Sequence, residues 1–176
     1  MINNNSVLFD IIDEYSVHKR KHYIILFGDS EKNCGFKYEQ AFLNSVANHL
    51  RKNGEIVTMK TKKRKTIEEI QNLFETEDDE QFIVLYSGHG SNSCGSLLIS
   101  DKHNLPIESL PENTILFTSS CKPYMSKNMR KNITIVGEKT SILYPHKPKK
   151  LFGVFADLNK LVADDGSEMC FDIRTY

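Results

Sequence analysis

A histidine and a cysteine lie at the two ends of one stretch of the chain, each after an apolar run and a few small polar residues. His89 stands in Ser-Gly-His-Gly after the run Phe82–Tyr86, and Cys121 follows Thr-Ser-Ser after the run Thr114–Phe117. A thiolate is a nucleophile, and a neighbouring imidazole activates it and exchanges protons with the reacting groups. These residue types predict covalent catalysis by a cysteine, provided that the fold brings the two side chains together.

The two apolar runs have the length and residue types of strands that are buried on both faces. If they are parallel neighbours, their carboxyl ends meet at one edge of the sheet, with adjacent strands about 5 Å apart. Open α/β sheets place their sites at that edge. The sequence therefore predicts that His89 and Cys121 share a site at the carboxyl edge of a parallel sheet.

The rest of the chain alternates helical and strand patterns. Helices are expected after a cap at Asn5 or Ser6, over about Tyr38 to Lys52, and from a capping-box pattern of Thr66 with Glu69. Strands are expected at Tyr23–Phe27, Glu55–Met59, Ser96–Ser100 and Ile133–Val136, with an edge strand through Met169, Phe171 and Ile173. Leu151–Phe155 fits either a strand or the start of a helix. This alternation predicts an α/β fold, a three-layer α-β-α sandwich with a mainly parallel sheet.

A chain of 176 residues fits one domain. We expect an N-terminal helix over 1–22, a core with both reactive residues over 23–136, and a loop, helix and edge strand over 137–176. The formal net charge is zero, so no global field favours nucleic acid. No apolar run reaches the roughly 18 residues of a membrane span, and the first residues lack the pattern of a secretory signal.

The four cysteines, at positions 34, 94, 121 and 170, are scattered singly without a CxxC pair. This usage predicts free thiols in a reducing, cytoplasmic environment. No Cys/His cluster has the spacing of a zinc site, so no metal is expected.

A strand that ends in Tyr-Ser-Gly-His-Gly, then a hairpin, then a strand that ends in Ser-Ser-Cys resembles the caspase-like cysteine peptidases. This group includes caspases, metacaspases, separases, clostripain-like and legumain-like enzymes and bacterial CHAT domains. The similarity covers the order of elements from about Tyr23 to Val136. It implies a caspase-like fold and an endopeptidase that acts on protein or peptide substrates.

The resemblance assigns the catalytic pair to His89 and Cys121. It implies that the oxyanion is bound by two backbone N–H groups, those of Gly90 and Cys121. No cofactor is implied by the motifs. Some members of the group need calcium or a partner for activation, so an activating protein partner is among the expectations.

The chain also departs from the family pattern. Caspases have a glycine two residues after the cysteine, with the histidine about 50 residues upstream. Here Lys122 and Pro123 follow Cys121, and the interval from His89 to Cys121 is 32 residues. Ser119 stands where metacaspases and clostripain-like enzymes have an Asp that helps to bind a basic substrate residue.

Substrate preference therefore does not carry over from the family. Asp29 and Glu31, after the first strand, are candidate substrate-binding residues together with Ser119. An acidic pocket built from Asp29 or Glu31 predicts a preference for Arg or Lys before the cut.

Two other functions remain open on the sequence alone. Gly28-Asp29-Ser30 resembles the Gly-Asp-Ser block of a family of esterases, with Ser30 as the nucleophile. That family also needs Asp-x-x-His near the carboxyl end, whereas Asp157 is followed by Leu-Asn-Lys. The other alternative is an inactive caspase-like binding module, because Lys122-Pro123 occupies a segment where the family has small residues.

Overall fold

The structure is a computed structural model, and it describes residues 2, 4, 6–28, 36–60, 66–76, 79–90, 95–100, 103–121, 123–125, 131–139, 149–161 and 168–176. The elements follow in the order α1 (Val7–Tyr15), β1 (Lys21–Phe27), α2 (Lys37–Lys52), β2 (Ile56–Lys60), α3 (Ile67–Asn72), β3 (Gln81–Ser87), β4 (Ser96–Ser100), β5 (His103–Pro106), a 3₁₀ helix (Ile107–Ser109), β6 (Ile115–Thr118), β7 (Thr134–Glu138), α4 (Val154–Leu158) and β8 (Phe171–Thr175).

The described part of the chain forms a six-stranded sheet in the order β2-β1-β3-β6-β7-β8. All neighbours in this sheet are parallel except β7 and β8, which are antiparallel. The strands β4 and β5 form a separate antiparallel hairpin. The prediction of an α/β fold with a mainly parallel sheet is confirmed, and so is the position of β8 at a sheet edge.

Apolar residues make the inner strands buried on both faces. Every residue of β3, β6 and β7 is buried, as are the last five residues of β1. Burial on both faces is what near-continuous runs of Ile, Leu, Val and Phe predict for parallel strands. The strands that precede His89 and Cys121, β3 and β6, therefore lie inside the sheet and not at its edges.

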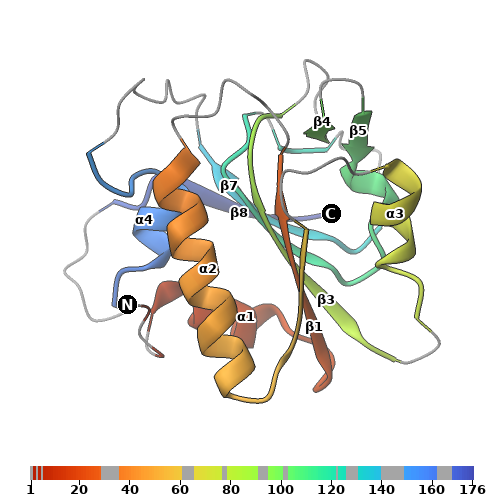
Figure 1. The fold of residues 1–176 in the computed structure, drawn as a ribbon, viewed down its shortest axis with the longest axis horizontal. Helices are drawn as coiled ribbons and strands as arrows, with labels where there is room; N and C mark the ends of the chain where they lie inside the picture. Colours follow the sequence, from red (N-terminus) through yellow and green to blue (C-terminus); the bar gives the residue numbers. More distant parts are fainter. Residues whose placement is uncertain are drawn as a thin grey trace.

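Helices and the hairpin cover the two faces of the sheet (Figure 1). On one side α1, α2 and α4 pack against side chains such as Ile25, Leu85 and Phe117. On the other side α3, β4, β5 and the 3₁₀ helix pack against alternate residues such as Leu26, Tyr86 and Leu116. The alternation of strand side chains between the two cores is the ordinary consequence of the pleat.

Local signals set several helix ends. Thr66 and Glu69 form the predicted capping box, with both hydrogen bonds at 3.1 Å. Gly54, just after α2, has a φ of +80°, the left-handed conformation that favours glycine at this position. Ser6 occupies the N-cap position of α1, but its side chain makes no capping hydrogen bond.

Two further predictions are decided by the structure. The segment that fitted either a strand or a helix start becomes helical at Val154, directly after Gly153 with its φ of +74°. The strand β5 was not among the predicted strands, and its last residue, Pro106, is of a type that rarely pairs within a sheet. Within the described ranges, no helix combines the length and apolar character needed to cross a lipid bilayer.

Candidate active site

The strands that precede His89 and Cys121 are parallel neighbours, as predicted. β3 and β6 pair from Ile83 with Ile115 to Tyr86 with Thr118. The N–H of Ser119 continues the pairing by donating to the carbonyl of Tyr86 at 3.4 Å. His89 and Cys121 therefore leave the sheet at the same carboxyl edge, from adjacent strands.

The main chain after β3 packs directly on the main chain after β6. A Cβ atom built on Gly90 would overlap the carbonyl oxygen of Cys121, and would lie 3.3 and 3.4 Å from its carbonyl carbon and nitrogen. Only a residue without a side chain fits this approach. The structure thus brings the residue next to His89 into contact with Cys121.

Both reactive side chains are open to solvent to some degree. His89 is exposed and Cys121 is partly exposed. The imidazole of His89 lies against the buried ring of Phe36, with ring centroids 5.1 Å apart and planes at 84°. This edge-on contact is a favourable aromatic geometry, and it supports the imidazole from the side of α2.

The N–H of Gly90 points away from the hairpin. Gly90 and Leu97 form an antiparallel bridge, and the N–H of Leu98 donates to the carbonyl of His89 at 3.0 Å. That bond places Gly90 opposite Leu97 in a non-hydrogen-bonded pair, in which the N–H groups face outward from the two strands. No hydrogen bond between described residues uses the Gly90 N–H, and Gly90 is partly exposed.

Ser119 is a buried residue, whereas a side chain that contacts substrate at the surface is expected to be exposed. It is 2% exposed, and its hydroxyl has no hydrogen-bond partner in the described part of the chain. The neighbouring hydroxyl of Ser120 accepts a hydrogen bond from Thr118 at 2.7 Å. A role for Ser119 in binding a substrate stays a prediction. Asp29, Ser30 and Glu31 lie outside the described residues.

The segment after Cys121 is anchored on the next strand. The ring of Pro123 lies over Gly137 of β7, where an added Cβ would be 2.6 Å from the proline Cγ. The Tyr124 hydroxyl donates to the Gly137 carbonyl at 2.9 Å, and the Arg174 guanidinium stacks on the Tyr124 ring at 3.8 Å. The proline that departs from the family pattern is therefore accommodated by a glycine of the adjacent strand.

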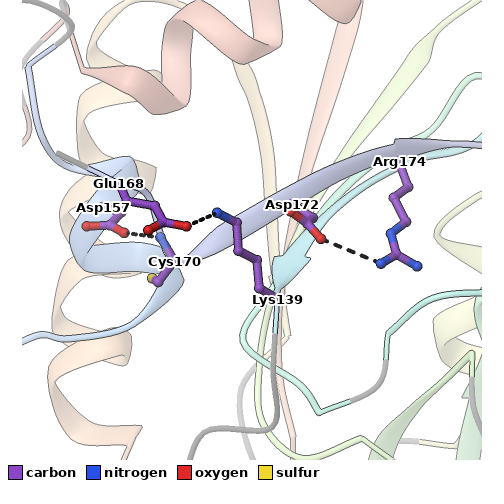
Figure 2. Close-up of polar contacts among 6 residues, drawn as sticks. All are labelled: Lys139, Asp157, Glu168, Cys170, Asp172 and Arg174. Carbon is purple, nitrogen blue, oxygen red and sulfur yellow. Dashed lines mark hydrogen bonds and ion pairs between the residues drawn. The ribbon is translucent and has the colours of Figure 1, made fainter. Parts of the chain in front are cut away.

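A second thiol, that of Cys170, lies in an environment unsuited to a nucleophile. Its backbone N–H donates to the Asp157 carboxylate at 2.7 Å (Figure 2). Burial, together with the hydrogen bond and charge of Asp157 and the charge of Glu138, raises the pKa of the Cys170 thiol to about 12. A thiol held in its protonated form is a poor nucleophile, so Cys170 is the natural reference for Cys121.

Three buried residues near the site, Glu39, Phe36 and Tyr86, were not named as site residues in the sequence analysis. Glu39, on α2, is 2% exposed and accepts a hydrogen bond from the Ser87 hydroxyl at 3.0 Å. Its spacing with Phe42 and Val46 places it on the buried face of the helix, and that spacing was available in the sequence. Phe36 and Tyr86 became relevant only when the loop geometry was known.

No family model matches the chain, and the curated proteins contain no significant match to it.

Proposed function

We propose that the chain is a caspase-like cysteine endopeptidase with His89 and Cys121 as its catalytic pair. The observation that carries this proposal is the contact of Gly90 with the Cys121 main chain, at the carboxyl edge of two neighbouring parallel strands. That contact supports the proposal because it joins the main chain next to His89 to the main chain of Cys121. An imidazole, a thiol and an N–H donor are the parts that acyl transfer by a cysteine requires.

The reaction has two steps. The Cys121 thiolate attacks the peptide carbonyl carbon, a C–S bond forms, and the oxygen takes the negative charge facing the N–H groups of Gly90 and Cys121. His89 in its protonated form gives its proton to the amine as the C–N bond breaks. In the second step His89 removes a proton from water, the hydroxide attacks the thioester, and the C–S bond breaks to release the acid and restore the thiolate.

The environment of Asp157 argues against the esterase alternative. One carboxylate oxygen accepts from the Cys170 N–H, and the other lies 2.6 Å from the Lys160 ammonium. Both oxygens are therefore engaged, and neither is bonded to a histidine in the described part of the chain. The sequence also has a lysine, not a histidine, three residues after Asp157, so the base of that family is missing at this position and the acid is bonded to other groups.

The decisive test of the peptidase proposal is a proteome digest in which new N-termini are sequenced. We expect cleavage by the wild-type chain and a loss of at least about 100-fold in Cys121→Ala and in His89→Ala, because general acid–base catalysis alone contributes about 10²–10⁴. Cys170→Ala is the matched control and should cleave normally. Arg or Lys before the cut would support an acidic pocket, and a preference for Asp would contradict it.

Alkylation by iodoacetamide separates an active site from an inactive binding module. The rate at Cys121 should fall in His89→Ala, because the imidazole no longer stabilises the thiolate. A comparison of the alkylation rates of Cys121 and Cys170 does not by itself separate the two functions. The raised pKa of the Cys170 thiol slows its alkylation in either case. Equal Cys121 rates in wild type and His89→Ala, without turnover of any peptide, would favour the binding module.

A further inference from the structure

The hydroxyl of Tyr86 is built into the turn that carries His89. Tyr86 is fully buried in β3, and its hydroxyl lies 2.8 Å from the carbonyl oxygen of His89 and 2.6 Å from that of Leu98. The Leu98 N–H also donates to the His89 carbonyl. The single proton of this hydroxyl is shared between the two carbonyl oxygens, so the hydroxyl joins the end of β3, the turn after it and the hairpin strand β4.

Two glycines leave the space that this hydroxyl occupies. A Cβ at Gly28 would lie 2.6 Å from the hydroxyl oxygen, and one at Gly88 would lie 2.5 Å from it. Burial raises the pKa of the Tyr86 phenol far above its usual range, and the Glu39 charge raises it further. The phenol is thus a neutral, permanent hydrogen-bond donor in a space that fits it closely.

The carbonyl of His89 and the N–H of Gly90 belong to one peptide unit. A trans peptide is planar, and its C=O and N–H point in opposite directions. A donor that holds the His89 carbonyl therefore also sets the direction of the Gly90 N–H. A hydrogen bond to the carbonyl further polarises the same amide and strengthens its N–H as a donor.

We propose that Tyr86 is a positioning residue, whose hydroxyl orients the His89–Gly90 peptide so that its N–H faces the oxyanion formed at Cys121. This inference rests on the proposed peptidase activity. Tyr86 does not touch the substrate. It acts through the peptide unit that does, and its effect is confined to steps in which a carbonyl oxygen becomes negatively charged.

The test compares two reactions of Cys121 in Tyr86→Phe. Peptide hydrolysis forms an oxyanion, whereas alkylation by iodoacetamide displaces iodide and forms none. Loss of a complete oxyanion donor costs about 10²–10³ in rate. Because the Leu98 N–H still holds the carbonyl, we expect kcat to fall about 10–100-fold, with KM and the alkylation rate within about twofold of wild type. Inhibition by a peptide aldehyde, which forms a tetrahedral adduct with the thiolate, should weaken by a similar factor.

Two further variants control for general destabilisation. Tyr23→Phe removes the hydroxyl of another buried tyrosine, which belongs to the core on the opposite face of the sheet, and should leave kcat unchanged. Gly28→Ala introduces a Cβ that overlaps the Tyr86 hydroxyl and also lies 2.9 Å from the Leu98 carbonyl oxygen. Its effect on kcat should be smaller in the Tyr86→Phe background than in the wild type, because the hydroxyl that it overlaps is then absent.

The outcomes separate failure of the inference from failure of the proposed function. Normal kcat and aldehyde inhibition in Tyr86→Phe would overturn the inference while the peptidase stands. A parallel loss of hydrolysis and alkylation would also overturn it, because that pattern marks a damaged fold. If the wild-type chain hydrolyses no peptide and His89→Ala does not slow alkylation, the proposed function itself fails, and the role of Tyr86 fails with it.

Discussion

The carboxyl group of Glu138 predicts a specific dependence of stability on pH. Glu138 ends β7 and is 4% exposed. One of its oxygens accepts from the Val154 N–H at 3.0 Å, and the other has no hydrogen-bond partner among the described residues. Burial raises the pKa of this carboxyl to about 7, the Asp157 charge raises it too, and the Val154 N–H acts in the opposite direction.

The size of the effect follows from the difference between folded and unfolded pKa values. The folded value of about 7 exceeds the ordinary value of 4.5, so the folded chain holds the proton more tightly. The contribution of the Glu138 carboxyl group to the free energy of unfolding is fully present below pH 4.5 and is lost as the pH rises through 7. Integration between pH 5 and pH 8 gives a fall of about 2–3 kcal/mol in the free energy of unfolding from this group.

Glu138→Gln removes this dependence because the amide has no charge to bury. Its carbonyl still accepts from Val154. At pH 8 we expect the variant to be more stable than the wild type by about 2–3 kcal/mol, which is roughly 5–10 °C in Tm for a chain of this size. At pH 5 the two chains should nearly coincide.

Urea unfolding at pH 5 and pH 8 measures these differences. Glu168→Gln is the matched control, because its side chain is 89% exposed and pairs with Lys139 at 3.3 Å on the surface (Figure 2). Exposed pairs contribute at most about 1 kcal/mol, so this control should keep the wild-type pH dependence. The reasoning is refuted if Glu138→Gln has the wild-type slope, or if it is the less stable chain at pH 8.

Three further predictions concern single contacts. Gly90→Ala should destabilise the fold by about 1–3 kcal/mol and change the alkylation rate of Cys121, because the new Cβ overlaps the Cys121 carbonyl. If the stability and the alkylation rate are both unchanged, the contact of Gly90 with Cys121 is loose. Asp157 has a lowered pKa, since hydrogen bonds from Cys170 and Lys160 outweigh burial. The Asp157 carboxylate therefore contributes to the free energy of unfolding above pH 3.8, and this contribution is lost on acidification. Asp157→Asn should be less stable by about 2 kcal/mol at pH 7 and lack that acid loss in urea melts. Thr66→Ala should cost about 1 kcal/mol through loss of the capping box, and an unchanged urea midpoint would contradict this.

The sequence was sufficient for the elements whose signals are local. The runs after Lys21 and Gln81 are apolar enough to be strands whatever their surroundings, and the capping box of Thr66 is contained in four residues. The strand β5 was not predicted, because it is short, ends in a proline and is defined by its pairing with β4. The helix α3 ends at Asn72, although Leu73 and Phe74 continue its helical spacing of apolar residues.

The part of the candidate site that could be predicted from the sequence is the part that depends on two buried strands being neighbours in the sheet. The positions of His89 and Cys121 after two buried strands predicted a shared edge, and the pairing of β3 with β6 bears this out. The close approach of Gly90 to Cys121 and the double contact of the Tyr86 hydroxyl join residues from different segments. Such contacts have no periodicity along the chain, so no sequence pattern predicts them.

The interior position of β3 and β6 has a consequence for hydrogen exchange. Their amides are bonded to strands on both sides, and β2 and β8 are the outer members of the sheet. Transient opening at either outer strand should expose the amides of β2 or β8 to deuterium without disturbing the inner pair. Amides of Leu85 and Phe117 should then exchange only through global unfolding, so the slowest-exchanging part of the molecule is the part that ends at Cys121.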